Sequence, residues 1–180
     1  AIAEVEAAGR LKPTAVMPVD LYGLPADYPA IAAIVDRHGM AVLADAAQSM
    51  GGASGNRRVG ALAPITATSF YPTKPLGCYG DGGAVLTERE DLADRVRMIR
   101  SHGRQGTGDA AMVLGLTGRL DTIQAAVLLA KLEVFDVELG RRRAIAARYN
   151  KGLADVVAVP TVPDGLESAH AIYTVRVRHR

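Results

Sequence analysis

Residues 66–77 read Thr66-Ala67-Thr68-Ser69-Phe70-Tyr71-Pro72-Thr73-Lys74-Pro75-Leu76-Gly77. The first six residues predict a β-strand, and Pro72 ends it because proline has no backbone N–H to donate to a sheet. Lys74 follows in a turn that two prolines make stiff, and it is one of only four lysines in the chain. A lysine in this place is either a solvated side chain or an amine held for covalent chemistry.

Further apolar runs lie on both sides of this segment. They predict strands over 14–19, 40–44, 66–71 and 83–87, and helices over 1–9, 27–38 and 88–101. Asp27 fits the N-cap of the helix over 27–38, and Gly39 fits its C-terminal end. This alternation of strands and helices predicts an α/β fold with a mostly parallel sheet covered on both faces. Ligands of such sheets bind beyond the carboxyl ends of the strands.

The second half of the chain has a different pattern. Residues 103–118 are rich in glycine and predict a loop, and two long helices are expected from 119 to about 153. Two strands over 156–159 and 171–175 predict the beginning of a second, smaller domain. The chain has no initial Met and stops within a strand-like alternation, so we expect a fragment of a longer protein.

The composition argues against several classes of function. The 180 residues carry a net charge of +2 with mostly scattered arginines, so we expect no nucleic-acid partner. No apolar run approaches the roughly 20 residues of a membrane span, so no membrane partner is expected. The single cysteine, Cys78, fits a reducing cytoplasm and is expected to be a small buried residue. No Cys/His cluster has the spacing of a metal site, so no metal is expected.

Asp45 follows the strand over 40–44, and Lys74 follows the strand over 66–71. Alone, Asp45 is typical of a helix N-cap or a loop hydrogen bond, and Lys74 of a solvated turn. Together at one edge of the sheet they suggest pyridoxal phosphate, which needs an amine for a Schiff base and a carboxylate on its ring nitrogen. Ser69 could donate to the phosphate, and Gln48 could lie beside the ring hydroxyl.

These residues also carry a family resemblance. The segments Asp45-Ala46-Ala47-Gln48, Ser69 to Ala84 and Gly118-Arg119-Leu120-Asp121-Thr122-Ile123-Gln124-Ala125-Ala126 resemble the DegT family of nucleotide-sugar aminotransferases. That family has the fold-type-I, aspartate-aminotransferase-like architecture. The resemblance implies that residues 1–118 are part of the large domain that binds pyridoxal phosphate. It implies connecting long helices over 119–153 and the start of a small α+β domain over 154–180.

The resemblance assigns four roles by position. Lys74 would form the Schiff base with pyridoxal phosphate and later carry the proton between the substrate carbon and the cofactor carbon. Asp45 would pair with the pyridinium nitrogen, Gln48 would lie by the ring hydroxyl, and Ser69 would hold the phosphate. A sugar dehydratase of the same family would have His at position 74, so Lys74 favours the aminotransferase. A non-catalytic regulatory member of the fold would not need the whole set.

Two more positions are implied to act across a homodimer with shared active sites. Thr117 stands where the family commonly has Asn, which reaches the cofactor phosphate of the neighbouring subunit. Arg119 stands where the family has an arginine close to the substrate. The alternative for Arg119 is a salt bridge at the start of a helix.

Within the family, these segments are most similar to the UDP-2-acetamido-2-deoxy-3-oxo-glucuronate aminotransferase branch. The implied reaction takes its amino group from glutamate and serves the biosynthesis of bacterial surface polysaccharide (lipopolysaccharide O-antigen) in the cytoplasm. An arginine such as Arg119 suits a uronate carboxylate because its planar fork can bind both oxygens. The alternatives are a 4-keto or another 3-keto sugar on dTDP or UDP. We also expect these 180 residues alone to bind pyridoxal phosphate weakly.

Overall fold

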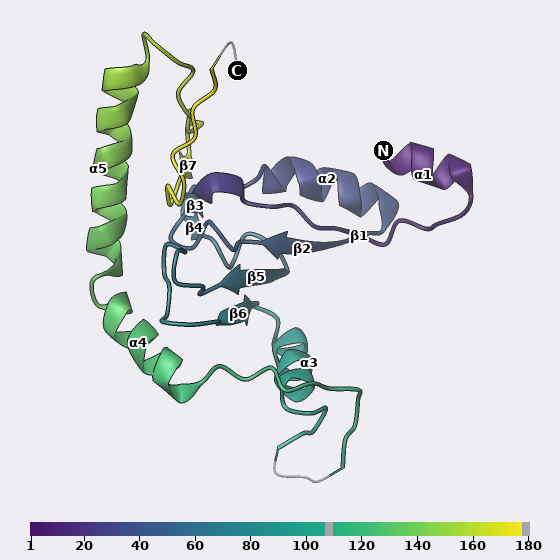
Figure 1. Ribbon diagram of the computed structural model, residues 1–180. Coiled ribbons are helices and arrows are strands. Elements are labelled where there is room, and N and C mark those ends of the chain that lie inside the picture. Colours follow the sequence, from purple (N-terminus) through teal and green to yellow (C-terminus); the bar gives the residue numbers. More distant parts are fainter. Residues whose placement is uncertain (107–109, 178–180) are drawn as a thin grey trace.

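The computed structural model describes residues 1–106 and 110–177 of the chain. A four-stranded sheet in the order β1-β2-β5-β6 forms its centre, and a smaller sheet has the order β4-β3-β7 (Figure 1). The strands are β1 (Ala15–Val16), β2 (Ala41–Asp45), β3 (Ala53–Ser54), β4 (Arg57–Arg58), β5 (Ile65–Ser69), β6 (Gly83–Leu86) and β7 (Leu166–Glu167). The helices are α1 (Ile2–Ala8), α2 (Tyr28–His38), α3 (Glu90–Arg100), α4 (Thr122–Leu132) and α5 (Phe135–Leu153), with a 3₁₀ turn η1 (Leu21–Gly23).

The central sheet is mostly parallel, as the sequence predicts. Strands β1 and β2 are parallel, and so are β2 and β5, whereas β6 runs antiparallel to β5. No helix separates β5 from β6 in the chain, so the chain returns directly and the two strands must run in opposite directions. The segment that turns the chain round contains Lys74.

Helix α2 begins and ends at the residues that the sequence indicates. The carboxylate of Asp27 accepts a hydrogen bond from the backbone N–H of Ala30 at 3.0 Å, which makes Asp27 the N-cap. Gly39 ends the helix with a φ of 60°, in the left-handed region that favours glycine. The helix packs Tyr28 and Val35 against Val42 and Ala44 of β2 in one buried cluster. This cluster fixes one side of the central sheet.

A second buried cluster joins the segment around Lys74 to the two long helices. It contains Phe70, Leu76 and Cys78 from the region after β5, Leu128 from α4, and Phe135 and Leu139 from α5, with Ala169. Cys78 is fully buried, as expected. Figure 1 shows α4 and α5 following one another along one side of the molecule. The segment after β5 is therefore packed into the core beside these helices.

The prediction of regular strands over 156–159 and 171–175 is wrong. Only an isolated bridge joins Ala158 to Arg176, through the hydrogen bonds of their two backbone amides. Pro160 and Pro163 follow Ala158 and have no N–H to extend a ladder. The regular strand of this region is β7, which pairs with β3.

The division of the chain at 118/119 and 153/154 stays a prediction. Residues 107–109 of the expected loop and residues 178–180 at the end of the chain lie outside the described residues. Within the described part, residues 101–106 and 110–118 contain no helix or regular strand, in agreement with a loop.

Candidate active site

Asp45 and Ser69 lie on the same face of the central sheet, near the carboxyl ends of adjacent parallel strands. Asp45 pairs with Ala67 in the β2–β5 register, and Ser69 follows two residues further along β5. Paired residues share a face, and residues two apart on a strand share a face too. Both side chains are half-buried. The sheet therefore places a carboxylate and a hydroxyl where an α/β sheet binds its ligands.

The Asp45 carboxylate is held by its own chain. Its Oδ1 accepts a hydrogen bond from the backbone N–H of Ala47 at 3.0 Å. Within the described residues its second oxygen has no hydrogen-bond partner, so it can accept a proton donor from a ligand. The small residues Ala46 and Ala47 leave room beside it.

Gln48 lies in the turn after β2 and is also half-buried. Its Oε1 accepts a hydrogen bond from the backbone N–H of Tyr22 at 2.6 Å. Tyr22 has a φ of 63°, which is costly for a residue with a side chain, and this hydrogen bond supports that conformation. With Oε1 engaged in this way, the Gln48 amide has its N–H groups to offer to a ligand.

Lys74 lies in a closed turn beyond the carboxyl end of β5. Its backbone N–H donates to the carbonyl of Tyr71 at 2.9 Å, and the N–H of Cys78 donates to the carbonyl of Phe70 at 2.8 Å. A Cβ on Gly77 would lie 2.7 Å from the carbonyl oxygen of Tyr71, so the turn closes this tightly only with glycine there. The Lys74 side chain is half-buried while Pro75 to Cys78 are buried. The amine is therefore carried by an ordered turn.

The chemistry of this set fits pyridoxal phosphate. Asp45, whose carboxylate has an unused oxygen, is the last residue of β2, and Ser69, with its hydroxyl, is the last residue of β5. The Lys74 amine follows β5 in the next turn. The Ser69 oxygen accepts the Tyr71 N–H at 3.2 Å, so its own O–H remains available to a phosphate. The assignment of Lys74, Asp45, Gln48 and Ser69 to pyridoxal phosphate stays a prediction.

Asp20 is a residue of this edge that the sequence pattern did not single out. It is 1% exposed, and its backbone N–H donates to the carbonyl of Asp45 at 2.9 Å. Its carboxylate accepts hydrogen bonds from the hydroxyls of Tyr28 (2.7 Å) and Ser49 (2.6 Å) and from the N–H of Ala26 (2.9 Å). Asp20 thus anchors the chain on both sides of Asp45–Gln48. Its position directly after an apolar run, like that of Asp45, is the signal that could have identified it.

Thr117 and Arg119 have other surroundings among the described contacts. The Thr117 hydroxyl is 3.4 Å from Nδ1 of His102, beside the C-terminal end of α3. Arg119 is exposed in the segment that leads into α4. Among the described residues, no hydrogen bond or ion pair joins either side chain to Lys74, Asp45, Gln48 or Ser69. The roles of both residues stay predictions, and a salt bridge of Arg119 at the start of α4 is absent from the described part.

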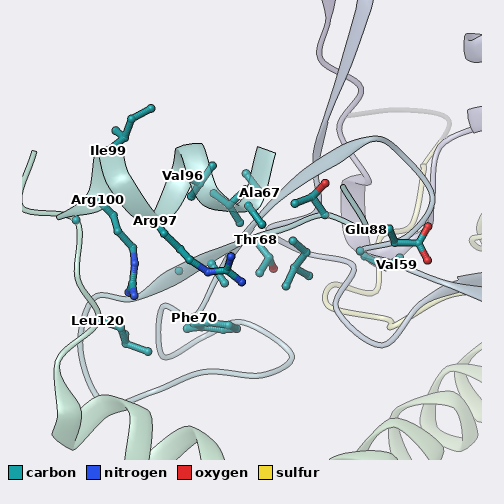
Figure 2. Close-up of a pocket in the computed structure, with 18 of the residues that line it drawn as sticks. Val59, Ala67, Thr68, Phe70, Glu88, Val96, Arg97, Ile99, Arg100 and Leu120 are labelled. Carbon is teal, nitrogen blue, oxygen red and sulfur yellow. The ribbon is translucent and has the colours of Figure 1, made fainter. Parts of the chain in front are cut away.

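A hollow beside the central sheet does not contain these residues. It has a volume of about 1030 Å³ and is lined mainly by β5, β6 and α3. Figure 2 shows Phe70, Arg97 and Leu120 among the side chains that line it. The hollow lies along β6, which is an edge strand because it pairs with β5 and with no other strand of the described chain. The hollow is mostly apolar, and neither Lys74 nor Asp45 lines it, so we do not assign the chemistry to it.

The described residues offer neither a metal site nor a membrane span. No group of three or more His, Cys, Asp or Glu side chains in the described ranges is arranged to hold a metal ion. Of the helices in those ranges, none is both long and apolar enough to cross a bilayer.

Comparison with known proteins gives close matches over the whole chain. The model of the DegT/DnrJ/EryC1/StrS aminotransferase family matches residues 1–180. A Pseudomonas aeruginosa UDP-2-acetamido-2-deoxy-3-oxo-D-glucuronate aminotransferase is 44% identical over 177 residues, which are 98% of this chain and 49% of that protein. A Streptomyces venezuelae dTDP-3-amino-3,4,6-trideoxy-alpha-D-glucose transaminase is 43% identical over 179 residues, 98% of this chain and 47% of that protein.

A crystal structure of a DegT DnrJ EryC1 StrS aminotransferase from Brucella abortus has the same fold. It is 51% identical, superposes with a TM-score of 0.94, and is matched over 97% of this chain and 47% of that chain. The chain therefore spans about half the length of the relatives that it matches.

Proposed function

This chain belongs to the DegT/DnrJ/EryC1/StrS aminotransferase family, and from this we propose that it forms part of a pyridoxal-phosphate-dependent aminotransferase acting on a keto-sugar nucleotide. The observation that carries the proposal is the strand-end set. Asp45 and Ser69 share one face of the sheet, and the turn after β5 carries Lys74. The presence of Lys74, Asp45, Gln48 and Ser69 together favours an enzyme over a regulatory protein that only keeps the fold, because a regulator does not need all four.

Each residue of the set has a task that follows from its chemistry. Bound pyridoxal phosphate draws electrons from the carbon that carries the amino group, which makes the proton on that carbon easier to remove. The Lys74 amine holds the cofactor and then moves that proton. The Asp45 carboxylate keeps the ring nitrogen protonated, because a nearby negative charge favours the cationic form. The Ser69 hydroxyl donates to the phosphate, and the Gln48 amide lies beside the ring hydroxyl.

The overall reaction is an exchange of an amino group for an oxygen. Glutamate gives up its amino group and becomes 2-oxoglutarate, and the keto carbon of the sugar receives that amino group. We propose UDP-3-keto-N-acetylglucosaminuronate as the sugar, in the biosynthesis of bacterial surface polysaccharide such as O-antigen in the cytoplasm. Similarity to the Pseudomonas relative and the exposed Arg119, which suits a carboxylate, support this choice.

A second substrate class has comparable support. The identities to the UDP-uronate relative and to the dTDP-trideoxyglucose relative are 44% and 43%. Overall identity therefore does not separate the two sugars.

The assay that separates them offers glutamate with a panel of UDP- and dTDP-linked keto sugars, with and without a carboxylate. Arg119→Met should raise KM for the uronate and leave KM for an uncharged sugar unchanged.

We further propose a homodimer in which each site takes residues from both subunits. Among the described residues no hydrogen bond or ion pair joins Thr117 or Arg119 to Lys74 of the same chain, and this supports a role for them in the site of a partner subunit. Mixing a Lys74→Ala protein with an Arg119→Met protein tests the arrangement. The wild-type KM for the uronate should return in the mixture, because one site of the mixed dimer then has both residues. No recovery after subunit exchange would contradict shared sites.

The covalent role of Lys74 has a direct test. Borohydride reduction of the protein with pyridoxal phosphate should fix the cofactor on the peptide that contains Lys74, as read by mass spectrometry. Lys74→Arg should abolish this product and the transamination, whereas Lys151→Arg, a change in an exposed lysine of α5, should leave both unchanged. A cofactor fixed on another lysine would contradict the proposed function.

A further inference from the structure

Helix α4 contacts the loop that follows Lys74 at two points. The Oε1 atom of Gln124 accepts a hydrogen bond from the backbone N–H of Tyr79 at 2.7 Å. The Nζ atom of Lys131 donates to the carbonyl oxygen of Gly77 at 2.5 Å and lies 4.7 Å from the centre of the Tyr79 ring. Both hydrogen bonds are to backbone atoms of residues 77–79, so they fix the path of the backbone there.

The two contacts come from one face of α4. Gln124 and Lys131 are seven residues apart, which is about two helical turns. Leu128 lies between them on the same face and packs in the buried cluster with Leu76 and Cys78. An apolar contact in the middle and a polar contact at each end therefore fasten the loop to the helix.

Gly80 of the loop is matched to this helix face. A Cβ on Gly80 would lie 3.2 Å from Nε2 of Gln124, so a larger residue there would press against the amide. The Lys131 ammonium is half-buried, and a hydrogen bond from a cation to a carbonyl is stronger than a neutral one. The Tyr79 ring, 73% exposed, adds a cation–π contact to it. These features are specific to this arrangement and would not arise from apolar packing alone.

We propose that Gln124 and Lys131 are positioning residues for Lys74. They hold residues 77–80 against α4, while the N–H of Cys78 closes the same loop onto Phe70. Lys74 lies between these anchors and β5, so its amine is directed by them. The inference rests on the proposed function, because a covalent role for the amine is what requires a fixed direction. Neither residue needs to touch the cofactor for this role.

The first test uses the cofactor-free protein and reads the Lys74 amine directly. Reductive methylation with formaldehyde and cyanoborohydride labels lysines, and the rate at Lys74 is divided by the rate at the exposed Lys12 of the same molecule. Gln124→Ala and Lys131→Met should each raise this ratio by about tenfold, because each removes a hydrogen bond that restrains the loop. Lys131→Arg keeps a donor and a cation and should restore the wild-type ratio. Lys151→Met, on the exposed side of α5, should leave it unchanged.

The second test reads the same variants in the holoenzyme. Gln124→Ala and Lys131→Met should lower kcat by about tenfold and leave KM for glutamate unchanged, since the amine is misdirected while the binding groups remain. Lys131→Arg should recover kcat. Unchanged methylation ratios in both variants, or unchanged kcat in both, would overturn the inference. A wild-type protein that fixes no cofactor on Lys74 would instead overturn the proposed function, whatever the methylation ratios are.

Discussion

Tyr28 is a residue whose buried hydroxyl makes the stability of the chain depend on pH. Burial raises the pKa of this phenol well above its ordinary value of 10.0, and the hydrogen bond to Asp20 and the charges of Asp20 and Asp45 raise it further. The folded chain therefore keeps the Tyr28 proton at a pH where the unfolded chain has lost it. This contribution to stability is complete below pH 10.0 and is lost as the pH rises above it.

We predict that the free energy of unfolding falls above pH 10 more steeply in the wild type than in Tyr28→Phe. The difference in slope should approach about 1.4 kcal/mol per pH unit, the value for one proton. Urea unfolding at several pH values between 9 and about 11 measures both slopes. Tyr71→Phe, a change in an exposed tyrosine, is the matched control and should keep the wild-type slope. Equal slopes in wild type and Tyr28→Phe would contradict the prediction.

The Asp20 carboxylate accepts hydrogen bonds from the hydroxyls of Tyr28 and Ser49, and its removal is the second prediction at this scale. Asp20→Ala leaves the hydroxyls of Tyr28 and Ser49 buried without their acceptor. We expect a loss of about 3 kcal/mol or more in the free energy of unfolding, because each orphaned buried group costs about 1–3 kcal/mol. Asp155→Ala, in an exposed position, should change it by less than about 0.5 kcal/mol. A double variant with Tyr28→Phe should lose less than the sum of the two changes.

At the scale of single elements, helix α2 has the clearest local stabilisation. Its N-cap bond joins Asp27 to the N–H of Ala30, and nothing else of the described chain binds that carboxylate. Asp27→Ala should therefore lower the free energy of unfolding, measured with urea, by about 1 kcal/mol, whereas Asp27→Ser should lower it by only a few tenths because serine can also cap.

Gly39→Ala should lower the free energy of unfolding by about 1 kcal/mol as well. Its added Cβ meets no atom within 4 Å, so the cost there is backbone strain alone.

The sequence predicted those elements whose signals are local. The helix over 27–38 has its cap and its glycine within the same stretch, β2 is mostly an apolar run, and β5 is rich in β-branched residues, which favour strands. Strands β3 and β4 were missed although Gly55-Asn56 between them is typical of a two-residue hairpin turn. Strand β7 has only two residues and owes its form to pairing with β3, which no local pattern of residues reveals.

The candidate site likewise contains residues that local patterns predict and residues that only long-range contacts bring into place. Asp45, Ser69 and Lys74 could be predicted because each stands at or just after the end of a predicted strand, where parallel strands bring ligand-binding groups together. Gln124 and Lys131 could not, because they bind backbone atoms 45 and 54 residues earlier in the chain. Asp20 likewise joins a carboxylate to a hydroxyl 29 residues later. Contacts of this kind depend on the packing of whole elements and leave no periodic trace in the sequence.

At the scale of the whole molecule, much apolar surface lies uncovered. Ile123 and Leu129 of α4 are 76% and 66% exposed, and the apolar hollow along β6 lies open between this strand and α3. The relatives are about twice as long as this chain. Surfaces of this kind are covered in stable proteins by further polypeptide or by a partner. The 180 residues by themselves thus have fewer restraints on the sheet and on the turn that carries Lys74.

We therefore predict that the 180 residues alone bind pyridoxal phosphate weakly and transaminate little. Ser69 is the single side chain that we assign to the phosphate of its own subunit, and one neutral hydrogen bond contributes only about 1 kcal/mol. Equilibrium dialysis should give a dissociation constant for pyridoxal phosphate at least about tenfold higher than that of a protein with the length of the relatives, a difference of about 1.4 kcal/mol. Lys74→Ala in the 180-residue chain sets the level of non-specific binding. Turnover of a keto-sugar nucleotide by the 180 residues at a rate similar to that of the longer protein would show that the set at the sheet edge is sufficient without further residues.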